Sequence, residues 1–198
     1  CWYVLDCEPG TEIVIGHHAR DKAEMEAMIR SQSWDKFIRK VPVKKGDFFQ
    51  IDPGCLHAIK GGTLILETQQ SSDITYRVYD YDRLSDGKPR PLHVEQSIAT
   101  INAPFVSCQG EMVKEELCGA VHTHLITCPY YSVDKYEIHG EWETEFASYF
   151  TNVSVLEGEG TVDGVPVKKG CHFILPHRYG NCKFRGELSI ICSSPEKA

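Results

Sequence analysis

The chain has 198 residues, with 28 acidic and 21 basic side chains and a formal net charge of −7. This acidic balance argues against general binding to nucleic acid or to an anionic membrane surface, because both require clustered Lys and Arg. No apolar run approaches the roughly 20 residues that a membrane-spanning helix needs. The hydrophobic content of 41% is enough for a buried core. We therefore expect one large or two small folded domains, with no nucleic-acid or membrane partner.

The N-terminal segment and the cysteines indicate the cellular setting. Residues 1–6 carry no basic stretch of the kind found in signal peptides, and the chain does not begin with Met. We expect it to be a fragment, with residues of its site lying upstream. The nine cysteines are scattered and include no C-x-x-C pair. This spacing argues against a disulfide framework or a Cys-based zinc knuckle, and it favours reduced thiols in a cytoplasmic protein.

The first half of the chain is predicted to be mostly strand with one helical insert. Strands over residues 2–5 and 12–16 flank a Pro9-Gly10 turn, which predicts a hairpin. Asp21 and Glu24 form a capping-box pattern that opens a helix running to about residue 30. A second short helical pattern covers residues 34–38. Strand-like segments follow at residues 41–43, 48–51, 58–59, 63–68 and 75–79.

The second half is also β-rich. Residues 85–91 contain one Gly and two Pro and predict a linker, after which a short helix is expected over residues 93–101. Asp163-Gly164 is a two-residue hairpin turn of the type that needs positive φ. Many short strands with few helices favour a sandwich, jelly roll or barrel. The expected strands are residues 130–133, 136–138, 146–150, 153–156, 161–162, 173–175 and 188–191.

An internal repeat refines this prediction. Residues 41–46, VPVKKG, recur letter for letter as residues 165–170, and an aromatic-bearing strand and a proline, Pro53 or Pro176, follow each copy. Two unrelated hairpins with a common surface turn are the alternative, but we interpret the pattern as two copies of one β-unit. The predicted domains are a first unit at 1–84 that is incomplete at its N-terminus, a linker and short helix at 85–105, and a second unit at 106–198.

The most specific local pattern is Gly46-x6-Pro53-Gly54-x2-His57. The glycines and the proline favour tight turns, and they place His57 at the start of the next strand, facing the interior of a barrel. An imidazole in that position is a natural ligand for zinc, iron or manganese. The pattern is similar to the second half of the cupin signature. A hydrogen-bonded core histidine is the alternative interpretation.

The second copy lacks this histidine. When Pro176 is aligned with Pro53, Gly180 falls at the position of His57 and cannot bind a metal. His172 and His177 lie nearby but out of phase. We therefore expect the second unit to hold no metal, and the chain to contain a single metal site.

A polar segment follows the metal-binding pattern. If residues 64–70 form a strand, alternation places Glu67 and Gln69 on one face. Asp73 and Arg77 are four residues apart and can pair. An arginine close to carboxylates and a metal histidine suits an anionic substrate, because a guanidinium binds phosphate or enediolate oxygens through two N–H groups. A surface salt bridge between Asp73 and Arg77 is the alternative.

Several segments resemble the type I mannose-6-phosphate isomerases, in their short bacterial form without the N-terminal part. The strongest is residues 67–83, ETQQSSDITYRVYDYDR, supported by residues 1–5 and 53–59, and residues 92–95 and 156–160 also fit. The resemblance implies a mainly β protein of two cupin-like jelly-roll units with a short helical insert. It also implies a zinc enzyme that interconverts mannose 6-phosphate and fructose 6-phosphate.

The resemblance assigns His57 as a zinc ligand and Arg77 as the catalytic arginine. It also implies that the remaining ligands, a Gln-x-His pair and a Glu, lie upstream of Cys1. Isomerisation through an enediolate needs an oxyanion-stabilising charge, for which Arg77 is suited, and a general base, for which Glu67 and Asp73 are candidates. We expect the substrate to contact Glu67, Gln69, Asp73 and Lys60.

Two other functions stay open. One is a non-catalytic cupin that binds sugar phosphates, and the other is an iron-dependent cupin dioxygenase that uses His122 and His124 as its His-x-His pair. In each case the expected partner is a small molecule, and the protein is expected to be a monomer or a weak oligomer.

Overall fold

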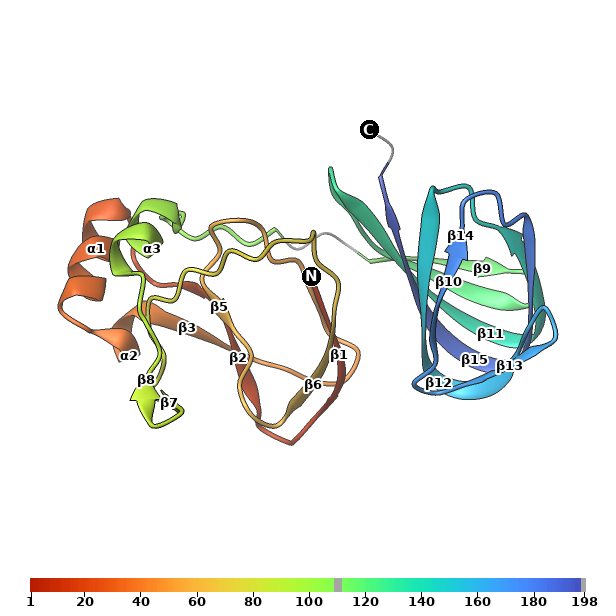
Figure 1. Cartoon of the computed structure of the whole chain (residues 1–198), viewed down its shortest axis with the longest axis horizontal. Coiled ribbons are helices and arrows are strands. Elements are labelled where there is room, and N and C mark those ends of the chain that lie inside the picture. The colour runs from red at the N-terminus through yellow and green to blue at the C-terminus, as the bar shows by residue number, and fades with distance from the viewer. Residues whose placement is uncertain (109–111, 197–198) are drawn as a thin grey trace. The chain divides into compact units, whose positions relative to one another are not determined.

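The computed structural model describes residues 1–108 and 112–196. The chain folds into two compact units, Cys1–Gln109 and Gly110–Ala198. Strands dominate both units, and the helices lie in the first (Figure 1). The predicted mainly β class is confirmed. None of the helices in the described residues is both long enough and apolar enough to span a membrane.

The described residues of the first unit form two three-stranded sheets, a small hairpin and three helices. The sheets have the strand orders β4-β1-β6 and β3-β2-β5, and β7 pairs with β8. The elements are β1 (Trp2–Cys7), β2 (Glu12–His17), α1 (Lys22–Arg30), α2 (Trp34–Phe37), β3 (Ile38–Pro42), β4 (Phe48–Phe49), β5 (His57–Ala58), β6 (Thr63–Glu67), β7 (Leu84–Ser85), β8 (Lys88–Pro89) and α3 (Val94–Thr100).

The predicted hairpin between the first two strands is wrong, although both strands exist. β1 pairs with β4 and β6, whereas β2 pairs with β3 and β5. The turn at Pro9-Gly10 therefore carries the chain from one sheet to the other. Alternation of apolar residues predicts that a strand is half-buried, but it does not specify which strand lies beside it.

The helical insert agrees with the sequence prediction. Asp21 caps α1 by accepting a hydrogen bond from the Glu24 amide at 2.8 Å. Met25 and Ile29, four residues apart, are buried on one face of the helix. They share a hydrophobic cluster with Phe37 of α2 and Ile98 of α3. The helices therefore form the apolar support for the segments that line the pocket described below.

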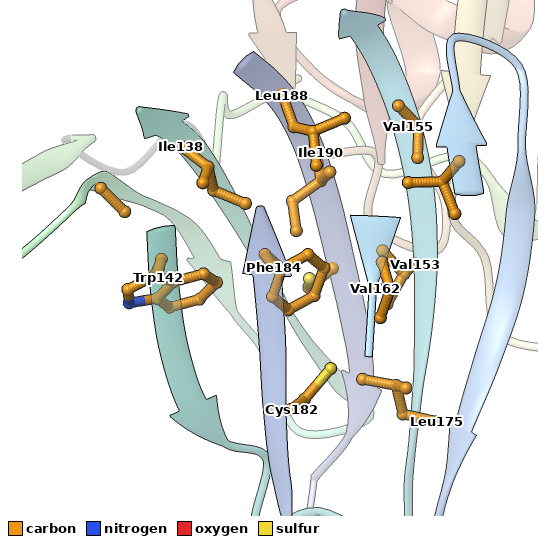
Figure 2. Packing of buried hydrophobic residues seen from close by; sticks show 13 residues of the cluster. Ile138, Trp142, Val153, Val155, Val162, Leu175, Cys182, Phe184, Leu188 and Ile190 are labelled. Atoms are coloured by element: carbon orange, nitrogen blue, oxygen red, sulfur yellow. The ribbon is translucent and has the colours of Figure 1, made fainter. Parts of the chain in front are cut away.

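The second unit is a seven-stranded antiparallel sheet. Its order is β13-β12-β15-β11-β10-β9, and β14 pairs with β12. The sheet encloses a core of large apolar side chains that includes Trp142, Phe184 and Ile190 (Figure 2). The strands are β9 (Val113–Leu117), β10 (Ala120–Thr127), β11 (Tyr131–Glu145), β12 (Phe150–Val162), β13 (Val165–Lys168), β14 (His172–Pro176) and β15 (Asn181–Pro195).

The strands of this unit are longer than the sequence predicted. β11 and β15 each have 15 residues and pair along their whole length. Short apolar runs mark only the parts of these strands that face the core. β9 was not predicted, because residues 113–117 are mostly exposed and charged and show no alternation.

The internal repeat is confirmed by its hydrogen bonds. The amide of Gly46 donates to the Val4 carbonyl at 2.9 Å, and the amide of Gly170 donates to the Val155 carbonyl at the same distance. Both glycines have positive φ, +90° and +85°. β1 and β12 also contain a β-bulge at equivalent places, directly after Val4 and Val155. The two turns with identical sequence therefore occupy equivalent positions in two related β-units.

The glycines of β12 allow its close approach to β15. Gly158 has φ +84°, and a Cβ there would collide with the Glu187 carbonyl oxygen. Asp163 and Gly164 both have positive φ, as the predicted hairpin turn requires. The positive φ and the close approach of the neighbouring strand thus explain why position 158, in the segment 156–160 (LEGEG), is a glycine.

Candidate active site

A pocket in the first unit brings together residues from five separated parts of the chain. Its apolar wall is formed by Val14, Trp34, Phe37, Ile38, Leu56 and Ala58. Its polar wall includes His57 and three arginines, Arg77, Arg83 and Arg90. An apolar wall with a few convergent polar groups is typical of sites for small molecules.

His57 reaches this pocket through a turn that only glycine fits. Gly54 has φ +83°, and a Cβ there would press against the side chain of Asn102 and the carbonyl of Thr100. His57 then opens β5 with an exposed ring. Its Nδ1 lies 2.8 Å from the carbonyl oxygen of Cys55. A carbonyl can only accept, so Nδ1 donates, and the lone pair that a metal ligand requires belongs to Nε2.

Arg77 lies in an irregular segment, where the sequence predicted a strand over residues 75–79. Its backbone makes two hydrogen bonds to His93 instead of pairing with a neighbouring strand. The Arg77 amide donates to His93 Nδ1 at 3.2 Å, and its carbonyl accepts from the His93 amide at 2.7 Å. Tyr79 stacks on Trp34 with ring centroids 4.6 Å apart. The hydrogen bonds of Arg77 and the stacking of Tyr79 thus hold this segment in place without the backbone pairing of a β-strand.

The arginines of the pocket surround one carboxylate. Asp80 accepts hydrogen bonds from the guanidinium groups of Arg90 and Arg83, and Arg77 Nε lies 3.7 Å from Asp80 Oδ1. The Arg90 and Arg83 hydrogen bonds lower the pKa of Asp80 to about 2. Three guanidinium groups around one carboxylate leave an excess of positive charge at the pocket. That excess favours an anionic ligand.

The other residues predicted to contact substrate lie outside the pocket lining, as far as the described residues define it. Glu67 ends β6 and accepts a hydrogen bond from Trp2 Nε1 at 2.9 Å. Gln69 lies beyond the end of that strand, so the predicted strand face does not extend to it. Lys60 lies 3.7 Å from Glu12. Asp73 is exposed, and the carboxylate that contacts Arg77 is Asp80.

Glu67 and His57 are nevertheless linked through one side chain. Trp2 donates to Glu67 and also packs edge-on against the His57 ring, with centroids 5.5 Å apart. Trp2 is buried and can therefore hold both residues in fixed positions. Trp2 thus connects Glu67 to the His57 ring, which the alternation pattern alone could not indicate.

Sequence reasoning missed Asp80, Arg83 and Arg90 as site residues. Asp80 and Arg83 belong to the same 67–83 segment that carries the family resemblance. Their spacing of three residues is a weak signal of a local ion pair. Arg90 lies in the predicted linker, where no local pattern marks it. Only the fold brings it to Asp80.

A separate group of possible metal ligands lies in the second unit. His122, His124 and Asp134 place three ligand atoms within 4.8 Å of one another. This is the one group of three or more such residues found in the described part of the chain, and His57 does not belong to such a group. The chain therefore contains a group that could bind a metal, in the unit where the repeat predicted none.

Comparison with known proteins identifies close relatives. Residues 121–195 match the family model described as mannose-6-phosphate isomerase, cupin domain. The chain is 42% identical over 198 residues to the mannose-6-phosphate isomerase ManA of Bacillus subtilis, and 42% identical over 200 residues to a mannose-6-phosphate isomerase of Streptococcus mutans. These alignments cover 98% of this chain but only 63% and 62% of the two relatives.

A solved structure gives the same result. The crystal structure of the mannose 6-phosphate isomerase from Bacillus subtilis matches with a TM-score of 0.93 and 41% identity, and it covers 98% of this chain and 63% of that one. The resemblance predicted from the sequence is therefore confirmed: the chain is similar to mannose-6-phosphate isomerases along nearly its whole length, and residues 121–195 of its second unit match the model of their cupin domain.

Proposed function

We propose that this chain forms part of an isomerase that interconverts mannose 6-phosphate and fructose 6-phosphate. One observation carries the proposal. The two residues to which the family resemblance assigns metal-binding and catalytic roles, His57 and Arg77, line the same pocket although 20 positions separate them in the sequence. The similarity to named isomerases over 98% of the chain supports the same conclusion.

The arginines of the pocket suit the charges of this reaction. An aldose–ketose isomerisation moves one proton between C1 and C2 and places negative charge on the sugar oxygens of an enediolate. Arg77 is partly exposed, and its guanidinium donates to the Pro91 carbonyl at 3.3 Å, which fixes its direction. It would stabilise the enediolate. The positive excess shared by Arg83 and Arg90 would attract the phosphate.

Two groups remain candidates for the general base. Glu67 accepts a hydrogen bond from Trp2, whose ring packs edge-on against His57, whereas Asp73 is exposed in the segment before Arg77. Because Trp2 holds it and also contacts the proposed metal ligand, Glu67 is the better candidate among the described residues. Gln69 and Lys60 would then contact the sugar or its phosphate from the rim, as expected from the sequence.

Zinc is the cofactor that we propose, and His57 fits it as one ligand. The free Nε2 of the ring and the hydrogen bond from Nδ1 to a backbone carbonyl are the arrangement that metal-binding histidines use. A catalytic zinc needs about three protein ligands. His57 is the ligand that we assign among the described residues, where no group of three possible ligands contains it. When bound, zinc would polarise the sugar oxygens as a Lewis acid.

The non-catalytic alternative uses the same pocket. A pocket rich in arginine can bind a sugar phosphate without a metal, and no three-ligand group in the described residues contains His57. We favour the enzyme because the similarity to named isomerases includes the Arg77 segment. In either case the partner is a small anionic sugar, and we propose a cytoplasmic location and a monomer or weak oligomer.

The test is an assay of the protein that contains these residues, supplied with zinc and mannose 6-phosphate in D₂O and followed by NMR. We expect fructose 6-phosphate to form, with deuterium at the carbon that exchanges its proton. Binding of mannose 6-phosphate without any product would overturn the isomerase and leave the non-catalytic function. Product formation at the same rate after complete removal of zinc would overturn the proposed cofactor.

A further inference from the structure

Two imidazoles and one carboxylate converge on adjacent strands of the second unit. His122 and His124 lie two residues apart on β10 and so point to the same side of the sheet. Asp134 lies directly opposite His124 on β11. Its Oδ1 is 2.8 Å from His122 Nε2 and 2.8 Å from His124 Nδ1. A single carboxylate oxygen therefore lies between the two rings.

The side chains of the cluster point to the face of the sheet that packs against the hydrophobic core of the second unit. In the register of β10 and β11, His122 lies opposite Tyr136, which packs against the hydrophobic core of this unit. On the next strand, Asp134 lies opposite Cys192, which is itself a buried member of that core. The cluster is thus anchored at an edge of the core and differs from a group of mobile surface side chains.

The cluster is nevertheless open to a ligand. The side chains of His122 and Asp134 are each 22% exposed, and that of His124 is 36% exposed. The His122 ring is held nearly parallel to Tyr136 at a centroid distance of 4.8 Å. The rings therefore have fixed directions, while one side of the group faces solvent. Both properties are needed for a binding site.

The outer nitrogens of both rings lie near oxygens that can accept a hydrogen bond. Nδ1 of His122 lies 3.9 Å from a carboxylate oxygen of Glu115, and Nε2 of His124 lies 3.3 Å from the hydroxyl oxygen of Thr127. A metal needs the inner nitrogens, Nε2 of His122 and Nδ1 of His124, to carry lone pairs, so each ring must hold its proton on the outer nitrogen. Thr127 lies within hydrogen-bond distance and supports that tautomer of His124, as the hydrogen-bond partners of metal-binding histidines do, whereas Glu115 is a nearby negative charge beyond hydrogen-bond distance of His122.

We propose that His122, His124 and Asp134 bind a divalent first-row transition-metal ion. Two imidazoles and a carboxylate form the donor set that suits zinc, iron, manganese or cobalt, with the remaining positions filled by water. Neighbouring ligand atoms in an octahedral site with bonds of about 2.1 Å are about 3.0 Å apart, so the 2.8 Å separations need only a small widening.

This site is distinct from the one proposed at His57, since it uses residues of the other unit. It also departs from the expectation, drawn from the register of the repeat, that the second unit holds no metal. That expectation rested on the alignment that places Gly180 at the position of His57, and the residues of β10 did not enter it. A network in which both rings only donate to Asp134 is the competing explanation, and metal titration separates the two.

The experiment is a cobalt titration of metal-stripped protein in the His57→Ala background, which removes the ligand proposed for the other site. Visible absorption and calorimetry report the Co²⁺ bound. We expect one Co²⁺ per chain. His122→Gln and His124→Gln should each weaken binding by at least about 100-fold, whereas His139→Gln, an exposed histidine of β11 paired with Glu187, should not change it. No binding in the background protein, or full binding after both substitutions, would overturn the site.

A second measurement needs no variant of the cluster and so does not depend on how those variants fold. In the same background, Co²⁺ should shift or broaden the backbone amide NMR signals of residues 122–136, with the largest effects at the three ligands. Effects centred on any other segment would contradict the assignment. Because His57 is absent, neither result depends on whether the protein is an isomerase.

Discussion

The two units use the same turn and the same bulge, yet they differ in what surrounds them. In the second unit, β15 is paired on both sides, by β12 and by β11, and its inward residues are almost fully buried. In the first unit, the strand equivalent to β15 is β6, which pairs with β1. The segment that follows β6 includes the pocket residues 75–81 and Arg83. The sequence VPVKKG therefore specifies the same local turn in both units. Whether a buried core or a polar pocket lies beside that turn depends on the strands that pair around it.

The first way to test this difference concerns His57, for which we expect the largest effect. In the protein that contains these residues, His57→Ala should remove most of the bound zinc and abolish isomerisation, because it deletes a ligand. Zinc content by mass spectrometry and activity would be measured together. His18→Ala, at an exposed histidine outside the pocket, is the matched control and should keep both. Full zinc and activity in His57→Ala would show that this histidine is structural.

The second test compares equivalent core positions. Ile65 lies opposite Val4, and Ile190 lies opposite Val155, at the same step after the repeat. Ile190 is completely buried, whereas Ile65 is only partly buried. Ile190→Ala should lower the free energy of unfolding by about 3–4 kcal/mol, and Ile65→Ala by about 1–2 kcal/mol. Urea unfolding measures both. Equal losses would mean that the two cores are packed alike.

The third test uses two glycines of one strand and its turn. Gly158→Ala should cost about 3 kcal/mol, because it adds a collision with the Glu187 carbonyl to the strain of positive φ. Gly164→Ala is the control, since its φ is +82° but no atom lies within 4 Å of the added Cβ. It should cost only about 1–2 kcal/mol. Thermal unfolding of both variants would show whether the close approach of β12 and β15 is as tight as described.

The smallest expected effect is a pH dependence confined to the first unit. The pKa of Asp80 is lowered to about 2 by its arginine partners, below the value near 3.9 of an unfolded chain. Its contribution to stability is therefore complete above about pH 4 and is lost as the pH falls towards 2. Pepsin, active in this range, should cut within residues 76–92 increasingly below pH 4.

The matched variants decide the origin of that effect. Asp80→Asn should make the same segment accessible to pepsin already at the upper end of the range and abolish the pH-dependent step. Asp35→Asn, at an exposed carboxylate of α2, should behave as wild type. A pH-dependent step that persists in Asp80→Asn would assign the effect to another group.

Local patterns predicted most of the elements but not their neighbours. The helix cap at Asp21 and the positive-φ turn at Asp163 follow from interactions within a few residues, and both are present in the structure. The pairing of β1 with β4 and β6 depends on contacts across more than 40 positions, which the alternation pattern does not encode. For this reason the strands were predicted and the first hairpin was wrong.

The site shows the same division. His57 was predicted from turn residues next to it in the sequence, and Arg77 from a family segment. Arg90 could not be predicted, because only tertiary structure brings it to Asp80. The group formed by His122, His124 and Asp134 is an intermediate case. Its His-x-His pair is visible in the sequence, but the carboxylate is supplied by the neighbouring strand.

The most direct test of the proposed function is the steady-state kinetics of Arg77→Ala in the zinc-loaded protein. If Arg77 stabilises the enediolate, kcat should fall by about 10²–10³-fold with little change in KM. Arg77→Lys should recover part of the loss, because an ammonium keeps the charge but lacks the planar pair of donors. Arg20→Ala, at an exposed arginine of the same unit, is the control. A raised KM with unchanged kcat would assign Arg77 to phosphate binding, and unchanged values of both would contradict its place in the active site.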